Sequence, residues 1–99
     1  MSLTDGINKA PGAAPDTATV AITTTEIVPA NTNRQWVFIT NVGAEDVFIA
    51  IGQPAELNKG MVLRSPDGSI VLDTTSCPTG AVNGIVAANT SAVIFQESA

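Results

Sequence analysis

The chain has 99 residues, of which 44% are hydrophobic and only 13% are charged, and its formal net charge is −5. This composition fits one globular domain with a single core and excludes a disordered protein or a protein with several cores. The basic residues are few and scattered, which argues against direct nucleic-acid binding, and no apolar run is long enough to span a membrane.

Residues 1–16 differ in composition from the rest of the chain. They are rich in Pro, Ala and Gly, and their large apolar groups are Leu3 and Ile7. Such a segment cannot build a core of its own, so we expect an extended N-terminal arm on 1–16 and a single domain on 17–99. The segment lacks the basic and apolar regions of a signal peptide, so we expect synthesis in a cytoplasm.

From residue 17 onward the pattern is that of short strands separated by turns. Val20 and Ile22 alternate with threonines, which favour pleated structure. Pro-Ala-Asn-Thr-Asn at 29–33 reads as a turn, and both 42–46 and 65–68 have the length and composition of hairpin turns. The predicted strands are 17–25, 26–28, 34–41, 46–52, 61–64, 69–73, 82–88 and 90–97.

About seven or eight short strands without a helical period predict an all-β domain. Turn signals every eight to twelve residues are typical of an antiparallel β-sandwich, a jelly-roll-like fold or a small barrel. We interpret 53–60 as a loop with at most one helical turn. The residues that we predict to be buried are Val20, Ile22, Val37, Ile39, Val47, Ile49, Ile51, Ile70, Leu72, Ile85, Val93 and Phe95.

The strand predicted at 34–41 is apolar on both faces. Val37 and Ile39 point to one side, and Trp36 and Phe38 point to the other. A sandwich covers only one face of each strand, so the second face needs the arm, a second subunit or a larger assembly as its cover. We therefore assign Trp36 to a core or an interface rather than to a sugar-stacking platform.

The sequence carries no pattern of catalytic or metal-binding residues. His and Tyr are absent, which removes imidazole bases, histidine nucleophile pairs and histidine metal sites. Glu45 and Asp46 are neighbours in a turn and point apart, and no acidic spacing resembles a calcium loop. Cys77 is the single cysteine, so no disulfide can form within the chain. We expect a protein that is not an enzyme and that has no cofactor and no metal.

The run VPANTNRQWVFITNVGAEDVFIAIG resembles small virion proteins of tailed phages and prophages. The later Pro-x-Gly turn and TGAVNGIVA before a final strand are similar to the same kind of protein, so the resemblance covers about residues 20–97. It implies a β-sandwich or β-barrel protein on the virion, most often a capsid decoration (cement) protein bound to the outer shell. The motifs are turn residues and core strands, so they are more specific for the family than for the role.

The resemblance implies the major capsid protein as partner and a homotrimer as the oligomeric state. The protein would be made in the host bacterial cytoplasm and would end on the capsid surface, where binding only the assembled shell stabilises that shell. No nucleic acid and no membrane is expected as a partner. The alternative is a carbohydrate- or receptor-binding module of a head fibre or tail, or a minor tail or connector protein.

Two groups of residues are candidates for contact with partners. The first lies in the arm, whose apolar and hydrogen-bonding side chains we expect to tether the domain to the capsid. The second lies at the Ala-Asn-Thr-Asn-Arg turn, where asparagines can close Asx turns and an arginine can bind carbonyls or a carboxylate. For that turn we favour a structural hairpin corner over a binding site. The arm candidates are Leu3, Ile7, Asn8, Lys9 and Pro11, and the turn or interface candidates are Asn31, Asn33, Arg34 and Trp36.

Overall fold

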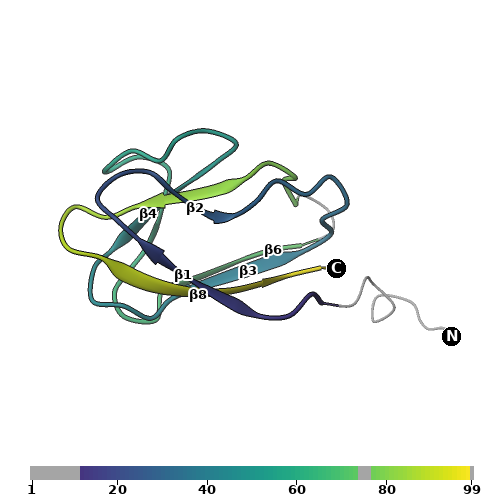
Figure 1. The fold of residues 1–99 in the computed structure, drawn as a ribbon, viewed down its shortest axis with the longest axis horizontal. Helices are drawn as coiled ribbons and strands as arrows, with labels where there is room; N and C mark the ends of the chain where they lie inside the picture. The colour runs from purple at the N-terminus through teal and green to yellow at the C-terminus, as the bar shows by residue number, and fades with distance from the viewer. Residues whose placement is uncertain (1–11, 74–76, 99) are drawn as a thin grey trace, which may run out of the picture.

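The computed structural model describes residues 12–73 and 77–98, so most of the predicted arm lies outside the described residues. The described residues form strands and no helix, and two four-stranded antiparallel sheets pack face to face (Figure 1). The predicted all-β sandwich is therefore confirmed. The strands are β1 (Asp16–Val20), β2 (Thr25–Val28), β3 (Val37–Asn41), β4 (Val47–Ile51), β5 (Met61–Leu63), β6 (Ser69–Leu72), β7 (Val82–Ile85) and β8 (Ser91–Glu97).

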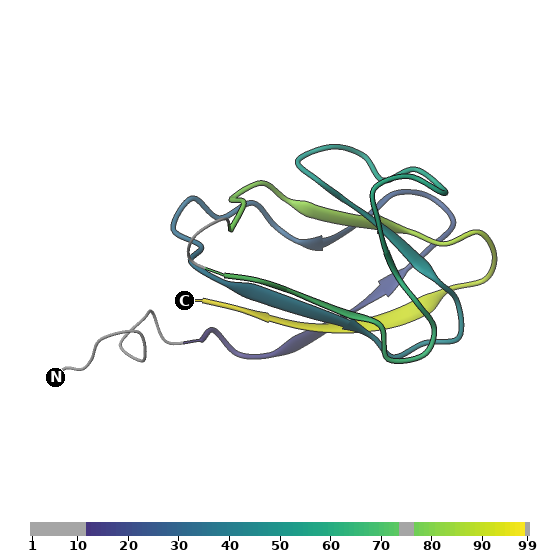
Figure 2. The same cartoon turned by 180° about the vertical axis from the view of Figure 1, so that it is seen from behind.

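The two sheets draw their strands from the whole length of the described chain. We call the sheet with strand order β1-β8-β3-β6 sheet I and the sheet with order β2-β7-β4-β5 sheet II. The chain passes from one sheet to the other at each connection between consecutive strands except that of β4 to β5. Figure 2 shows the same two layers from behind.

The hairpins predicted at 42–46 and 65–68 are wrong. β3 and β4 lie in opposite sheets, and so do β5 and β6. Both turns instead carry the chain around the end of the sandwich, because the apolar inner faces of the flanking strands meet across the core. The Nδ2 group of buried Asn41 fixes this corner by donating to the carbonyls of Glu45 (2.7 Å) and Leu63 (2.9 Å). Turn length alone does not reveal such a corner.

The core is a single layer of aliphatic side chains between the sheets. The prediction is confirmed for Val20, Val37, Ile39, Val47, Ile49 and Val93, which are buried, and Ile51, Ile70, Leu72 and Phe95 are half-buried and pack against them. The remaining members of the core lie on β2, β5 and β7 or directly after β7. These further buried residues are Ile27, Val28, Leu63, Val82 and Val86.

Ile22 was predicted to be buried and is instead 59% exposed. The predicted strand 17–25 is interrupted, because β1 ends at Val20 and the chain bends at residues 22–23 before it enters sheet II as β2. The hydrophobic alternation restarts in β2 with Ile27 on the inner side. The backbone N–H of Ala21 donates to Thr25 Oγ1 (3.1 Å), which holds the bend.

Ile85 was also predicted to be in the core, but it is half-buried on the outer side of sheet II. The inner positions of this segment are Val82, Gly84 and Val86, all of which are buried. A Cβ atom on Gly84 would lie 2.8 Å from Ile27 Cδ1 and 3.1 Å from Val47 Cγ1. The glycine therefore makes room for core side chains of the neighbouring strands β2 and β4, and this sets the phase of β7.

Ile49→Ala tests the core. Ile49 is 1% exposed, and we expect its truncation to lower the free energy of unfolding by about 2–5 kcal/mol through lost burial and a residual cavity. The matched control, Ile22→Ala at the exposed bend, should change it by only about 0.5 kcal/mol. Urea unfolding of both variants measures the difference. Equal losses in the two variants would contradict the placement of these side chains.

Candidate functional site

Arg34 joins several segments at one end of the sandwich. Its side chain is fully buried, and its Nε donates to Glu97 Oε1 at 2.9 Å. Nη1 donates to the carbonyls of Pro78 (2.8 Å) and Gly80 (2.9 Å), and Nη2 donates to the carbonyl of Pro29 (2.7 Å). The expected binding of Arg34 to carbonyls and a carboxylate is confirmed. The guanidinium is committed to the chain's own loops, so its role here is structural.

The turn that leads to Arg34 contains one Asx turn, where two were possible. Asn31 Oδ1 accepts the backbone N–H of Asn33 at 3.0 Å, which is the predicted geometry. No second turn forms on Asn33, because the N–H of Gln35, which would close it, donates to Ser98 Oγ at 2.7 Å. The Asn33 side chain is exposed, whereas Asn31 also reaches Glu97 Oε1 at 3.5 Å. These residues build a structural corner, but the predicted hairpin is wrong, because β2 and β3 lie in opposite sheets.

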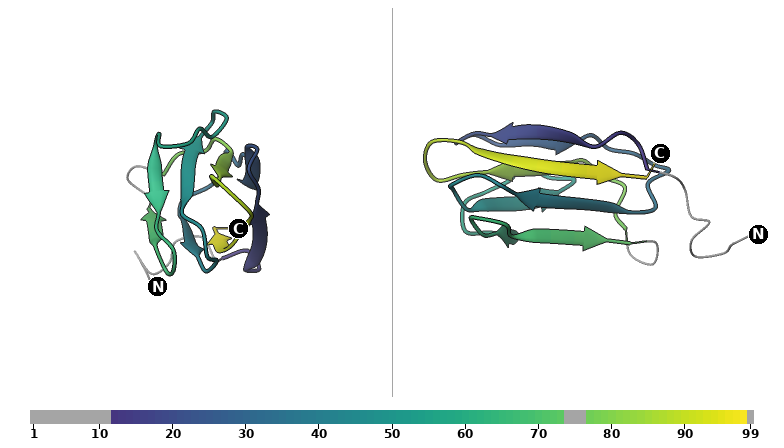
Figure 3. Two further views of the ribbon diagram at one scale, coloured as in Figure 1. Left: turned by 90° about the vertical axis from the view of Figure 1, so that its left-hand side faces the viewer. Right: turned by 90° about the horizontal axis from the view of Figure 1, so that it is seen from below.

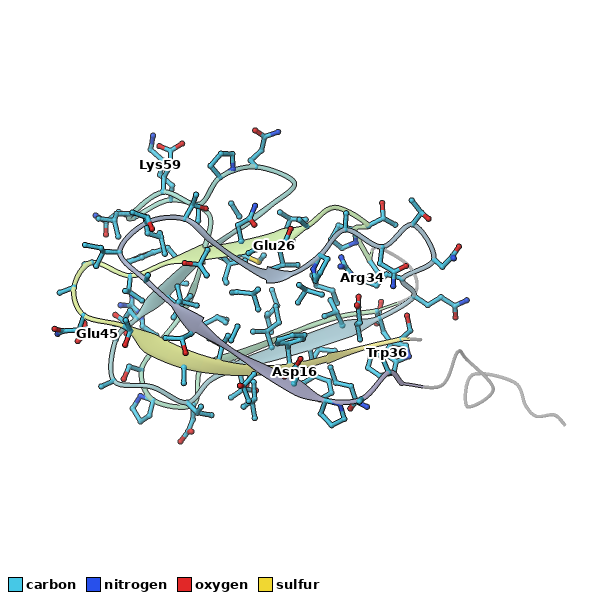
Figure 4. All side chains as sticks on the ribbon, in the orientation of Figure 1. Asp16, Glu26, Arg34, Trp36, Glu45 and Lys59 are labelled. Atoms are coloured by element: carbon cyan, nitrogen blue, oxygen red, sulfur yellow. The ribbon has the colours of Figure 1, made fainter. Side chains whose placement is uncertain are left out.

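Asn41 joins segments at the end of the sandwich opposite to Arg34, and it is not among the site residues predicted from the sequence. Besides the bonds donated by Nδ2, its Oδ1 accepts from Gly43 N (3.1 Å) and from Ser91 Oγ (2.7 Å). Gly43 cannot carry a side chain here, because a Cβ atom would collide with Ser91. Figure 4 shows Arg34 near one end of the molecule and Glu45, whose backbone carbonyl Asn41 binds, at the other.

Asp46 binds the start of the 65–68 turn at the same end of the sandwich as Asn41. Its carboxylate accepts the backbone N–H of Ser65 (2.8 Å) and Nη1 of Arg64 (3.1 Å). The Ser65 hydrogen bond, with help from Arg64, holds the pKa of Asp46 below its ordinary value. The stabilisation that follows is present above the ordinary pKa and is lost as the pH falls through the lowered pKa.

The outer face of sheet I carries no charged side chain in its strands. Register and burial place alternate residues of β1, β8, β3 and β6 outward, away from the core. Figure 3 (right) shows these four strands side by side, with no described loop over their centre. Val71 is 72% exposed and Ile94 is 40% exposed on it. We call this surface the open face, and its residues are Thr17, Thr19, Phe38, Thr40, Ser69, Val71, Ala92, Ile94 and Gln96.

Trp36 borders the open face and is half-buried. Its ring stacks parallel to Phe38, with the ring centroids 6.3 Å apart and the planes inclined by 3°. Gly12 lies against it, since a Cβ atom there would be 3.1 Å from Trp36 Cη2. Ala13 N donates to Glu97 O (2.9 Å), so the chain before β1 runs along the end of β8. Gly12 thus lies against the Trp36 end of the face that needed a cover.

The outer face of sheet II is closed differently, by the loop between β4 and β5, which Figures 1 and 2 show lying beyond that sheet. Ala55 is buried, and its N–H donates to Thr24 Oγ1 at 2.8 Å. Asn83 Nδ2 donates to the carbonyl of Gln53 at 2.7 Å. A shallow depression remains beside this loop, lined by small and polar residues that include Glu26, and no aromatic ring borders it. The two outer faces are therefore not equivalent.

The described residues contain no group of three or more Cys, Asp, Glu or His side chains that could hold a metal ion. Burial raises the pKa of the Cys77 thiol, which disfavours the reactive thiolate. None of the described residues belongs to a helix that could cross a membrane.

The arm candidates Leu3, Ile7, Asn8, Lys9 and Pro11 lie outside the described residues. Of the turn candidates, Asn31 and Arg34 meet at one corner, Asn33 contributes its backbone N–H, and Trp36 lies beside the open face. No family model, no curated protein and no solved structure matches this chain. No single sequence motif predicts the open face, because its residues come from four strands whose order must be known first.

Arg34→Met tests the structural role of the corner. Removing the guanidinium leaves Glu97 and three carbonyls without their buried donor, so we expect the free energy of unfolding to fall by about 3–5 kcal/mol. The control is Arg64→Met, which breaks an exposed ion pair with Asp46 and should cost less than about 1 kcal/mol. Chemical denaturation measures both. A loss at position 34 no larger than that at position 64 would show that the corner is not structural.

Proposed function

We propose that this chain is a non-enzymatic structural protein of a phage virion that binds the outside of the assembled head. The proposed partner is the major capsid protein, and the proposed place is the capsid surface. The sequence resemblance supports the family, and the β-sandwich is the fold that the resemblance implies. The described residues contain no group of Cys, Asp, Glu or His side chains that could hold a metal ion.

The observation that carries the proposal is the open face of sheet I. A flat strand surface with exposed Val71 and Ile94 and without charge in its strands is unusual in a chain of net charge −5. Such a surface can lie on a partner without burying an unpaired charge, which would be costly. Many weak contacts of this kind, repeated over a symmetric shell, act together to hold the shell in its assembled state.

The resemblance implies a trimer, and we retain self-association as part of the proposal. The arm is proposed as a second, tethered contact with the shell, made through its apolar and hydrogen-bonding side chains. Gly12 and Ala13 pair with the end of β8, so the proposed tether consists of residues within 1–11.

The glycan-binding alternative predicts an aromatic side chain in a polar groove. Trp36 instead stacks on Phe38 and contacts the Gly12 segment, and the depression beside sheet II has no aromatic side chain in its lining. The geometry therefore favours surface contact over sugar stacking. Electron microscopy of the source virion with an antibody to this chain separates the two, because a decoration protein gives regular labelling over the head. Labelling at one vertex or at the tail tip would point to a fibre, tail or connector protein.

Ile94→Lys tests the open face in a binding assay with purified heads that lack this protein. Ile94 lies between Thr17 and Thr40 at the centre of the face, and a lysine there would place a charge in the contact. We expect the occupancy of the heads to fall at least about tenfold, which corresponds to about 1.4 kcal/mol. Co-sedimentation with the heads measures the occupancy.

The matched control for that assay is Leu57→Lys. Leu57 has the same exposed fraction as Ile94, 40%, but it lies on the loop beyond sheet II. Its substitution should leave occupancy unchanged. A loss with Leu57→Lys and none with Ile94→Lys would place the contact on the other side of the sandwich, and a wild-type chain that binds no heads would refute the proposal.

Deletion of residues 1–11 tests the tether separately. The cut leaves the Gly12 to Ser98 bridge and β1 in place, so unfolding should stay cooperative with a nearly unchanged melting temperature. Occupancy on the same heads should fall, because the second contact is lost. Equal occupancy with and without the segment would leave the open face as the only attachment.

A further inference from the structure

The sheet edges differ in how they are protected against pairing with another chain. Edge strands that expose free backbone groups are normally blunted by charges, proline, bulges or short length. β1 follows Pro15 and begins with Asp16, and β2 carries Glu26, a register irregularity and a following Pro29. β5 has only three residues and is followed directly by Arg64.

β6, the other edge of sheet I, has these protections only at its ends, where Asp67 lies two residues before the strand and Asp73 follows it directly. Its residues Ser69, Ile70, Val71 and Leu72 include no charge and no proline, and its register with β3 shows no irregularity. Val71, in the middle of its apolar run, has the largest exposed fraction of the exposed large hydrophobic residues described, 72%. Four consecutive residues of an edge strand are thus suited to accept another strand.

The β6 edge is also held in a fixed shape. It pairs with β3 over its whole length, from Val37 opposite Leu72 to Thr40 opposite Ser69. Just before the strand, Asn41 N donates to Gly68 O (2.8 Å), and the Asn41 carbonyl accepts Asp67 N (2.7 Å). A strand fixed in this way loses little conformational freedom when it pairs with a partner, which lowers the cost of association.

We propose that two copies of this chain pair through β6, antiparallel and related by a two-fold axis that passes beside Val71. In this arrangement Val71 faces Val71 of the second copy, and Ile70 faces Leu72 of the second copy. The two four-stranded sheets I then form one continuous sheet with both open faces on the same side. Half-buried Ile70 and Leu72 gain cover from each other, which extends both cores at the edge.

Charge selects this register among the possible ones. In antiparallel pairing, residues directly opposite each other point to the same face of the sheet. The register can therefore shift only in steps of two residues if both open faces are to stay on one side. The proposed register sets Asp73 opposite Ser69 of the second copy. A shift toward Ser69 would set Asp73 opposite Asp67 of the second copy, where like charges repel, and a shift toward Asp73 would set that carboxylate opposite Val71. Only the proposed register gives apolar pairs throughout the centre.

The residue pairs in this register also explain why the partner strand belongs to a second copy of the chain. A two-fold contact requires a strand that complements itself, and the sequence Ile-Val-Leu with uncharged Ser69 before it and Asp73 after it does so. The inference stands apart from capsid binding, since it concerns the isolated chain. It gives dimers rather than the trimer implied by the resemblance. The contact is small, so the dissociation constant should be on the order of 100 µM.

Analytical ultracentrifugation of the full chain from about 1 µM to about 1 mM tests the pairing across the expected dissociation constant. The wild type should convert from monomer to dimer. Val71→Lys places two ammonium groups against each other at the two-fold axis and should stay monomeric. Thr19→Lys, an exposed outward position on the opposite edge of the same sheet, should dimerise like the wild type.

A cysteine pair tests the register in a Cys77→Ala background. With Val71→Cys, the introduced thiols face each other across the axis at a distance that a disulfide can span, and glutathione disulfide should link the chains. Ser69→Cys is the matched control, because its two copies would lie about 13 Å apart along the strands. A linked dimer through position 71 and not through position 69 supports the proposal.

The opposite results overturn it. A wild type that stays monomeric at the highest concentration, or that forms trimers, excludes the two-fold pair. A dimer that Val71→Lys does not weaken, or faster linkage at position 69 than at position 71, places the contact elsewhere. Circular dichroism melting confirms that each variant is folded, and if Val71→Lys is unfolded, the cysteine pair decides alone.

Discussion

The guanidinium of Arg34 binds the Glu97 carboxylate and three backbone carbonyls at the end of the sandwich. These partners belong to the end of β2, to the connection before β7 and to β8, so a single side chain ties both sheets together. A buried charge is costly, and it is tolerated here because the carboxylate and the carbonyl dipoles replace its hydration. Each of these loops would otherwise have to bury carbonyl groups without donors. The chain can alternate between the two sheets because hydrogen bonds at such corners pair the backbone groups of the connecting loops.

Much of the sandwich follows from local sequence, and its connections do not. Strand β3 and the core role of Val37 and Ile39 follow from alternation, which acts over neighbouring residues, although β3 begins at Val37 and not at residue 34 as predicted. The crossing from β3 to β4 does not, because it depends on Asn41 reaching the carbonyl of Leu63, a residue remote in sequence. Gly84 is a similar case, since its place in the core is set by Ile27 and Val47 on neighbouring strands. Local pattern predicts elements, and contacts between distant segments decide the topology and hence the open face.

The described ion pairs lie away from the open face. Arg34 and Glu97 meet at one end, Arg64 and Asp46 meet near the other, and Lys59 pairs with a neighbour on the loop beyond sheet II. The outward side chains of the sheet I strands are apolar or neutral polar, since Asp16 and Glu97 lie at inward positions of β1 and β8. Burial of such a surface in one small contact contributes little binding free energy. Binding becomes strong when the contact surface is extended or when the contact is repeated.

The β6 edge offers such an extension without any bending of the sheet. Joining two copies at Val71 would place both open faces on one side, so that a partner surface meets both at once. The second face would then bind at the effective concentration set by the first, and two weak contacts would act as one stronger contact. The net charge of −5 on each chain opposes this association, but the nearest acidic residue in the strand register, Asp73, faces a serine rather than another carboxylate. Face and edge are thus compatible within one assembly, because neither contact uses residues whose hydrogen bonds hold the corners.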